Sequence, residues 1–240
     1  MIAIRSLVKS YGDTRAVQGL SLDVAPGEIL GLIGPNGAGK TSTLRCIAGI
    51  HRPTGGSVSS GGHDIVQDPI EAQKLIAFVA DEPHLFEHLT VIEHLRLTGR
   101  IYGVADVESR AKALLDDVEL AGRETSLPAE LSRGMKQKVM LACAFLHEPK
   151  ALVLDEPLTG LDPLGIHRMK RSIVSAAQRG VAVVVSSHLL HLVEEICTRI
   201  VIINHGVKVA DGTLAELAAH ARAEGTTLEK IFLDVTGSDH

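Results

Sequence analysis

The sequence predicts an α/β fold with a mainly parallel β-sheet and an inserted helical lobe. Short apolar runs of strand length alternate with helical patterns, which is typical of a parallel sheet covered by helices. The core must be aliphatic, because 45% of the residues are hydrophobic while only 2% are aromatic. Between residues 85 and 132 helical patterns occur without a clear strand. We therefore expect this stretch to form the lobe.

The expected strands share a short, continuous apolar run, and the expected helices share apolar residues at helical spacing. The strands are 29–33, a short one near Val58, 75–80, 151–154, 181–186 and 199–203. The helices are 40–48, 91–101, 107–120, 163–178 and one that carries the apolar face of residues 189–197. Together they predict a single domain over residues 1–240. Its parts are an α/β core over about 1–84 and 133–220, the lobe over about 85–132, and a C-terminal segment over about 221–240.

Composition narrows the possible functions. The formal net charge of −5 argues against a nucleic-acid partner, for which a basic face is expected. Cys46, Cys143 and Cys197 have no metal-ligand spacing, so we expect small core residues in a reducing cytosol. The chain contains no signal-peptide pattern at its start and no run of ~18 apolar residues. We therefore expect a soluble protein that acts at a membrane only through another protein.

Residues 34–41 carry the complete phosphate-binding motif G-x-x-x-x-G-K-T between a predicted strand and a predicted helix. Glycines let backbone N–H groups curl around a triphosphate, and the helix N-terminus adds a positive dipole end. We expect Lys40 to reach the β- and γ-phosphates of ATP and Thr41 to place its hydroxyl on Mg²⁺. The expected nucleotide-binding residues are Gly34, Pro35, Asn36, Gly37, Ala38, Gly39, Lys40, Thr41 and Ser42.

Two adjacent acids, Asp155 and Glu156, end the apolar strand predicted at 151–154. A strand this apolar has little reason to end in adjacent acids unless they are used. We expect Asp155 to hold Mg²⁺, directly or through water, and Glu156 to polarise the water that attacks the γ-phosphate. The pair therefore predicts hydrolysis of ATP by water, not phosphoryl transfer to a substrate.

Residues 131–137, with the sequence LSRGMKQ, resemble the signature of ABC transporter ATPases, which is usually LSGGQ. Alone, Ser132 would more often be an ordinary helix N-cap. The order of further motifs favours the family, and the resemblance covers nearly the whole chain. These motifs are Tyr11 in an adenine-stacking loop, residues 78–83 as the Q-loop, Leu161-Asp162 as the D-loop and Ser187-His188 as the switch histidine.

The resemblance implies a P-loop NTPase core with a small N-terminal antiparallel β part. It also implies a head-to-tail dimer in which the P-loop of one subunit and Ser132 and Gly134 of the other enclose one ATP. His188 is implied to contact the γ-phosphate and to support Glu156. The implied partners are an integral membrane permease subunit and a second ATP-binding subunit, either an identical chain or a different one.

The direction of transport and the location of the protein in the cell are implied by the same resemblance. The signature resembles the LSxGM variant of bacterial exporter ATPases, and residues 227–237 resemble an ending, LEDVFLxLTG, common in ATPases that serve drug, antibiotic or polysaccharide exporters. An amphipathic closing helix would give a similar pattern. We expect an exporter ATPase at the cytoplasmic face of the membrane.

The Q-loop departs from the usual pattern of the family. Its usual Gln touches Mg²⁺ and the attacking water, and here Asp81 stands at that place as a candidate Mg²⁺ ligand. An alignment shifted by one residue would put Glu82 there instead. The apolar Leu85 and Phe86 follow in a polar loop, where the family docks a helix of the membrane subunit. They either form an exposed docking patch or pin the lobe to the body.

Two other function classes remain open. A soluble ABC ATPase that moves a ribosome or DNA is disfavoured by the single cassette, the absence of a heptad run and the acidic balance. A P-loop kinase is disfavoured by the signature, the D-loop and the switch histidine.

Overall fold

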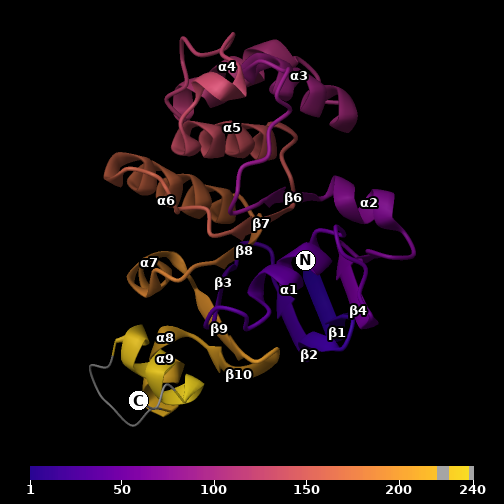
Figure 1. The fold of residues 1–240 in the computed structure, drawn as a ribbon, viewed down its shortest axis with the longest axis vertical. Helices are drawn as coiled ribbons and strands as arrows, with labels where there is room; N and C mark the ends of the chain where they lie inside the picture. Colours follow the sequence, from indigo (N-terminus) through magenta and orange to yellow (C-terminus); the bar gives the residue numbers. More distant parts are fainter. Residues whose placement is uncertain (221–226, 238–240) are drawn as a thin grey trace.

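A computed structural model describes residues 1–220 and 227–237, which form an α/β body with a helical lobe at one end (Figure 1). The larger of its two sheets has the strand order β10-β9-β3-β8-β7-β6. Five of its strands run parallel: β3 (Ile29–Ile33), β6 (Ile76–Val79), β7 (Ala151–Asp155), β8 (Ala182–Ser186) and β9 (Arg199–Asn204). The edge strand β10 (Val207–Gly212) is antiparallel. This arrangement confirms the predicted fold class.

A second sheet forms the antiparallel β part, in the order β2-β1-β4-β5. Its strands are β1 (Ile2–Tyr11), β2 (Thr14–Val24), β4 (Gly55–Ser60) and β5 (His63–Asp64). The helix α1 (Lys40–Ile47) lies between the two sheets, because its Leu44, Cys46 and Ile47 pack in one apolar cluster with residues of both. The helix that follows the phosphate loop is thus held from two sides.

Side chains along the parallel strands alternate between two faces, and both faces are buried. In β7, Ala151 and Val153 point toward α1, whereas Leu152 and Leu154 pack in the cluster built by α6 (Pro163–Gln178) and α7 (Leu190–Ile196). Burial on both faces explains why these strands read as continuous apolar runs. Beyond β9 the body is closed by α8 (Leu214–His220) and α9 (Leu228–Thr236).

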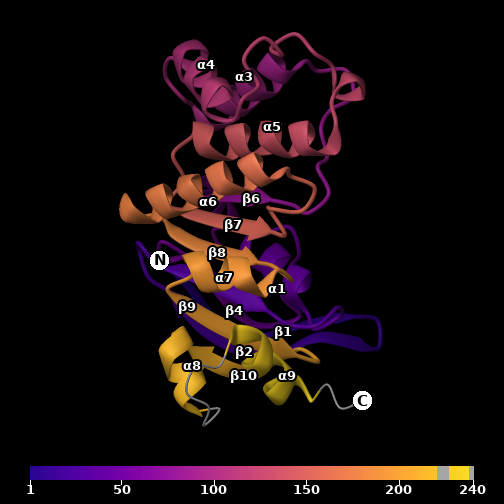
Figure 2. The same ribbon diagram turned by 90° about the vertical axis from the view of Figure 1, so that its left-hand side faces the viewer.

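The lobe is joined to the body by one long helix, α5. The helices concerned are α3 (Val91–Tyr102), α4 (Val107–Asp117), the short 3-10 helix η1 (Pro128–Glu130) and α5 (Arg133–Leu146). Figure 2 shows α5 between the lobe helices α3 and α4 and the rest of the body. Val139 and Ala142 of α5 belong to the apolar cluster of α3 and α4, whereas Leu141 and Ala144 belong to that of the body. The boundary expected after residue 132 therefore falls at the start of a helix that packs on both parts.

Some elements escaped prediction for local reasons. The helix α2 (Pro69–Lys74) begins with a proline at its first position and is too short to show a periodicity. In β1 the two-residue alternation is broken at Ser6, whose φ of 46° lies in the left-handed region beside a register shift. Residues 221–226 and 238–240 of the expected C-terminal segment lie outside the described residues. Within the described part, no helix has both the length and the hydropathy needed to cross a membrane.

The three cysteines are free thiols. Cys46 is buried, and Cys143 and Cys197 are partly buried. Burial raises the pKa of Cys46 and of Cys143 to about 11, and that of Cys197 to about 12. The thiols are therefore protonated at neutral pH and act as packing groups, as expected.

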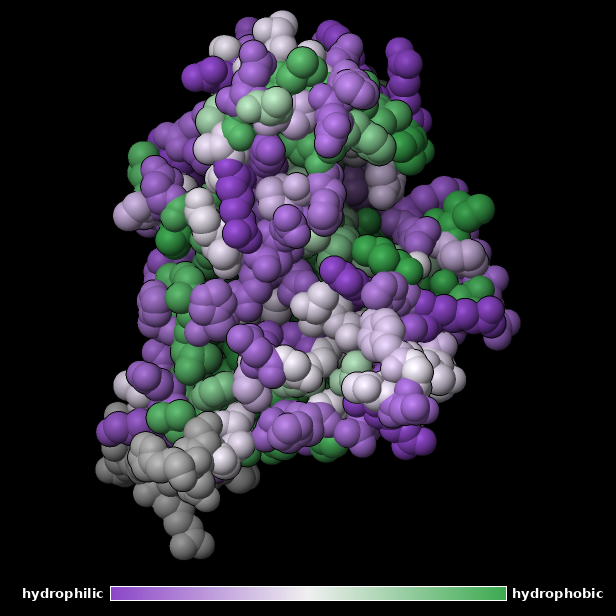
Figure 3. Space-filling model, in the orientation of Figure 1, coloured by the Kyte–Doolittle hydropathy of each residue, from purple (hydrophilic) through white to green (hydrophobic). Residues whose placement is uncertain are grey.

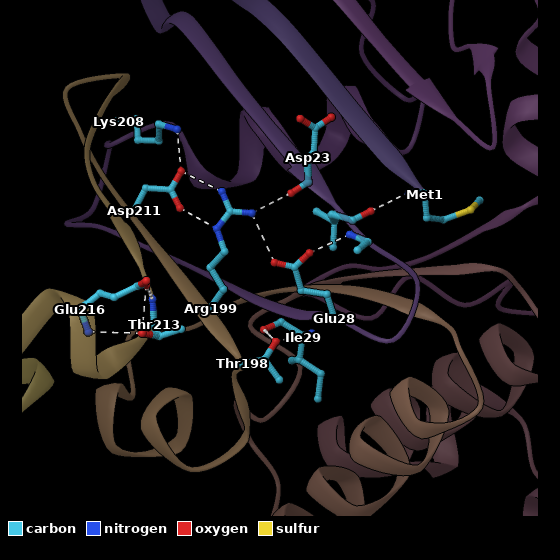
Figure 4. A network of polar contacts seen from close by, with 12 residues as sticks. Met1, Asp23, Glu28, Ile29, Thr198, Arg199, Lys208, Asp211, Thr213 and Glu216 are labelled. Atoms are coloured by element: carbon cyan, nitrogen blue, oxygen red, sulfur yellow. Dashed lines mark hydrogen bonds and ion pairs between the residues drawn. The ribbon is translucent and has the colours of Figure 1, made fainter.

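Arg199 joins several segments at the amino ends of the parallel strands (Figure 4). Its Nε and Nη2 donate to the carboxylate of Asp211 at 2.6 and 2.8 Å, and its Nη1 donates to the carbonyl of Asp23 at 3.0 Å and to Glu28 Oε1 at 3.3 Å. Lys208 also donates to Asp211, at 2.6 Å. Burial alone would raise the pKa of Asp211, but Arg199 and Lys208 outweigh it and lower that pKa.

Replacing this central arginine tests its contribution to stability. Arg199→Gln should lower the free energy of unfolding by about 2 kcal/mol, the range for losing hydrogen bonds to a charged group. Because the pKa of Asp211 is lowered in the folded state, this stabilisation is present above the ordinary value of 3.8 and is lost as the pH falls through the folded pKa. The difference between wild type and variant in urea unfolding should therefore shrink below pH 3.8.

The matched control is Arg5→Gln. Arg5 forms its ion pair with Asp23 at 2.7 Å, but both side chains are largely exposed. Its loss should cost less than about 0.5 kcal/mol. Equal losses in the two variants at neutral pH would contradict a special role of the Arg199 network.

Candidate active site

The phosphate loop connects β3 to α1 at the carboxyl edge of the parallel sheet. Gly39, the N-cap of α1, has a φ of 102°, and a Cβ at this position would lie 2.2 Å from the carbonyl oxygen of Ala16. At Gly34 a Cβ would lie 2.2 Å from the carbonyl oxygen of Ile203. Backbone atoms cannot move aside as a flexible side chain can, so both positions require glycine. The loop is thereby shaped as a cradle lined by backbone.

The ammonium group of Lys40 lies at this loop, and the residue is only 9% exposed. Its Nζ donates to the carbonyls of Gly34 at 2.6 Å and Pro35 at 3.1 Å. Burial lowers the pKa of Lys40, while the negative charges of Glu156 and Asp155 raise it. An ammonium has three N–H donors, and within the described residues its partners are these two carbonyls. One donor remains for a phosphate oxygen.

Asp155 and Glu156 share one serine hydroxyl. Asp155 is 3% exposed, and its Oδ1 accepts from Ser186 Oγ at 2.7 Å. The same oxygen of Ser186 accepts from the backbone N–H of Glu156 at 3.1 Å. Glu156 has a φ of 49°, a left-handed conformation that costs a non-glycine residue about 1–3 kcal/mol. Ser186, which sequence reasoning missed, therefore helps to hold both acids in place.

His188 contacts Glu156 directly. The Nδ1 atom of His188 lies 2.8 Å from Glu156 Oε2, and its backbone N–H donates to the same oxygen at 3.2 Å. The contact follows from sheet register, because Asp155 at the end of β7 pairs with Ser186 at the end of β8. The two residues that the family resemblance paired are thus brought together, with Glu156 partly buried and His188 exposed.

The oxygen ligands expected for Mg²⁺ come from different elements. Thr41 lies in the first turn of α1, and Asp155 ends β7. Among the described residues no cluster of three or more His, Cys, Asp or Glu could hold a metal alone. Mg²⁺ typically uses one or two carboxylates together with phosphate and water oxygens. The donor set therefore fits a magnesium–triphosphate complex: a glycine cradle, a buried ammonium group and a buried carboxylate.

The Q-loop follows β6. The carboxylate of Asp81 accepts from Arg133 Nη2 at 3.0 Å, whereas Glu82 is exposed. Gln137 Nε2 donates to the carbonyl of Ala80 at 3.3 Å. The first turns of α5 therefore contact the Q-loop through the charged side chain of Arg133 and the neutral side chain of Gln137. The pairing of Asp81 with a residue of the signature motif was not predicted.

The signature and the D-loop lie against each other. Ser132 is the N-cap of α5, as expected of a serine at this position, because its hydroxyl accepts from the N–H of Met135 at 3.2 Å. Other N–H groups of that first turn have no acceptor within the helix. Asp162 caps α6 in the same way. A Cβ on Gly134 would lie 2.9 Å from the carbonyl oxygen of Gly160, so the start of α5 touches the D-loop.

Tyr11 ends β1 with its ring exposed. Its hydroxyl lies 2.6 Å from Nδ1 of His51, and Lys9 Nζ lies 4.8 Å from the ring centroid. Burial, together with the charges of Lys9 and Arg45, lowers the pKa of His51. The neutral imidazole can therefore accept the Tyr11 hydroxyl, which fixes the ring at the surface.

Comparison with known proteins decides the family. The sequence profile described as ABC transporter matches residues 17–159. The chain is also 36% identical to the ABC-type transporter ATP-binding protein EcsA of Bacillus subtilis, over 100% of this chain and 98% of that protein. The chain belongs to the ABC transporter family. The Nod factor export ATP-binding protein I of Paraburkholderia xenovorans is 38% identical over 88% of this ABC chain and 70% of its own length.

Solved structures agree with this assignment. The structure of an ATP-binding subunit of an ABC transporter matches with a TM-score of 0.94 and 35% identity, covering 98% of this chain and 99% of that one. A dimeric bacterial ABC transporter cassette matches at 0.83 and 25% identity, covering 89% and 99%. Its post-hydrolysis state with ADP and Pi matches at 0.80, with the same identity and coverage. The ABC chain is an ATP-binding subunit with ATPase activity, as the sequence predicted.

A single methyl group in the cradle should disturb nucleotide binding. Gly39→Ala should weaken ATP binding at least about tenfold, which corresponds to about 1.4 kcal/mol, because the new Cβ must displace the backbone at Ala16. The measurement is equilibrium binding of a fluorescent ATP analogue.

Gly62→Ala is the control for this substitution. Gly62 also has a positive φ, of 89°, but a Cβ there would meet no atom within 4 Å. Its binding constant should stay within about twofold of wild type. If the two variants bind ATP equally well, the shape of the loop at Gly39 is not what binds the phosphates.

Proposed function

We propose that this ABC subunit forms a head-to-tail dimer around two ATP–Mg²⁺ complexes and powers a separate integral membrane subunit. The observation that carries the proposal is the contact of Glu156 with His188, at 2.8 Å, beside the buried Asp155. The dimer is supported by the positions of α5 and α1. In both views α5 lies under the lobe while α1 lies within the body (Figures 1 and 2). A phosphate that touches both helix starts would have to lie between two chains.

The chain's own groups divide the chemistry of hydrolysis among them. The backbone of residues 34–42 and Lys40 bind the phosphates, and Tyr11 stacks on the adenine. Thr41 and Asp155, with Asp81 as a further ligand, hold Mg²⁺, which neutralises phosphate charge when bound. Glu156 takes the proton of the attacking water, since its carboxylate is held in place by His188 and by a strained backbone. Ser132 and Gly134 of the second copy close on the γ-phosphate.

The proposed partners are a second copy of this chain and a membrane permease at the cytoplasmic face. Export is the proposed direction, and it is supported by the relatives that are named export ATP-binding proteins. A nucleic-acid partner is not proposed, because the chain carries a net charge of −5.

Glu156→Gln tests the catalytic and the assembly parts together. The amide keeps the shape of the side chain but cannot take a proton, so turnover should fall by at least ~10²-fold while ATP binding survives. Since hydrolysis reopens the dimer, the variant should accumulate as an ATP-bound dimer in size-exclusion chromatography with light scattering.

Glu148→Gln is a matched control, because Glu148 also has a left-handed φ, of 52°, and pairs with Arg110 at 2.5 Å on the surface. It should hydrolyse ATP at the wild-type rate and should not accumulate as an ATP-bound dimer. A wild-type turnover number in Glu156→Gln would remove Glu156 from its proposed role.

The loop after the Q-loop is the proposed docking surface for the membrane subunit. Leu85 packs in the apolar cluster of the lobe, so it pins the loop in place. Phe86 is 65% exposed, and its ring stacks on His94 with the centroids 6.0 Å apart. The surface is hollowed where the lobe meets the body (Figure 3). Phe86 is therefore proposed to contact the permease together with Pro83, His84 and Leu89.

Phe86→Asp should uncouple the subunit from the permease without harming the fold. The exposed ring contributes little to stability, so the melting temperature and the basal ATPase rate should stay at wild-type values. Stimulation of that rate by the membrane subunit in proteoliposomes should be lost.

The control is Ile70→Asp on α2, because Ile70 has a similar exposure of 67%. It should keep the stimulation. A lowered melting temperature in Phe86→Asp would instead assign Phe86 to packing between the lobe and the body.

A further inference from the structure

Asp81 and Arg133 form an ion pair between segments that are 52 positions apart, with Arg133 Nη2 at 3.0 Å from Asp81 Oδ1. Asp81 follows β6, and β6 lies beside β7, the strand that ends in Asp155. Arg133 is the first residue of α5. The pair therefore links the edge of the sheet that carries the candidate active site to the helix that carries the lobe.

The position of Arg133 is set by packing. A Cβ built on Gly160 would lie 3.4 Å from Cδ of Arg133, so the aliphatic part of the arginine lies over the D-loop. Gln137, one turn further along α5, donates to the carbonyl of Ala80 at 3.3 Å and is itself buried. These contacts hold the start of α5 beside the Q-loop, and the guanidinium reaches the carboxylate from there.

We propose that Arg133 is a positioning residue for Asp81 and thereby sets how strongly ATP binding depends on Mg²⁺. This inference rests on the proposed nucleotide site. Arg133 offsets the negative charge of Asp81 and holds its carboxylate toward α5. Free Asp81 would repel the triphosphate when Mg²⁺ is absent and would attract Mg²⁺ when it is present. The ion pair weakens both effects.

The charges around the site make such an offset useful. Asp155 and Glu156 already act on Lys40, and an unpaired Asp81 would be a third carboxylate at the same edge. The side chains of Asp81 and Arg133 are 49% and 53% exposed, so water screens their attraction. A pair this exposed is weak enough for Mg²⁺ to compete for the carboxylate, and breaking it leaves neither charge buried.

A double-mutant cycle with Asp81→Asn, Arg133→Gln and the double variant tests the coupling. The readout is equilibrium binding of a fluorescent ATP analogue over a range of Mg²⁺ concentrations, at protein concentrations where the chain is monomeric. Without Mg²⁺, Asp81→Asn should tighten binding and Arg133→Gln should weaken it, each by about two- to fivefold. Arg133→Gln should also show the steeper Mg²⁺ dependence. In the Asp81→Asn background, Arg133→Gln should have almost no effect.

A second readout needs no nucleotide. Hydrogen exchange of the amides at 80–82 should speed up by a similar factor in both single variants and no further in the double variant. Arg133→Lys should restore much of the wild-type Mg²⁺ dependence, because it restores the charge. Arg96→Gln is the control, since Arg96 pairs with Glu108 on the lobe surface at 2.6 Å and should leave both readouts unchanged.

The outcomes separate this inference from the proposed function. If Arg133→Gln changes the Mg²⁺ dependence equally in both backgrounds, or not at all, the inference is wrong while the ATP site stands. If wild type and Lys40→Ala bind the analogue equally well, the proposed nucleotide site is itself wrong.

Discussion

The burial of both faces of the parallel sheet is the constraint on which the active site depends. Strands such as β7 bury alternate side chains in two clusters, so polar groups are tolerated only where a strand ends. The carboxyl ends of parallel strands meet at one edge of the sheet. Asp155 and Ser186 are thereby brought within 2.7 Å of each other, although 31 positions separate them. The carboxylates near the phosphate loop therefore follow from sheet topology and need no separate framework.

The phosphate loop also depends on burial of the parallel sheet, because the helix that follows the loop covers one face of that sheet. Helix α1 is packed between two sheets, so its first turn cannot shift to admit a larger residue. Backbone approach is close at Gly34 and Gly39, and the carbonyl of Ala38 accepts from Gly206 at 3.0 Å. Glu156, in contrast to these glycines, is a non-glycine residue with a left-handed backbone conformation, which costs conformational energy. Rigid surroundings can hold such a conformation, which explains how one strained acid is kept directed at His188.

Much of the fold and of the candidate active site could be predicted from the sequence, and the features that were missed have physical causes. The bounds of β3 and α6 were predicted correctly, because a continuous apolar run and a proline at the first helical position are strong local signals. The alternation in β1 is interrupted by Ser6, so that strand gave a weak signal. Ser186 was missed because a lone serine at a strand end has no distinctive pattern, and its role depends on a neighbouring strand. The proximity of Glu156 and His188 came from the family resemblance and not from spacing.

The contacts between lobe and body are of two kinds, apolar and polar. Along α5, Leu141 is buried against the body and Val139 is buried against the lobe. Separating the lobe from the body would therefore expose apolar surface. Other contacts between the lobe and the body are polar. Glu119, which follows α4, pairs with Lys138 at 3.1 Å and with Arg168 of α6 at 3.0 Å, and Asp81 pairs with Arg133. Polar contacts near water exchange partners at little cost. The exposed Asp81–Arg133 pair can therefore exchange partners, while the apolar seam of α5 keeps the lobe attached to the body.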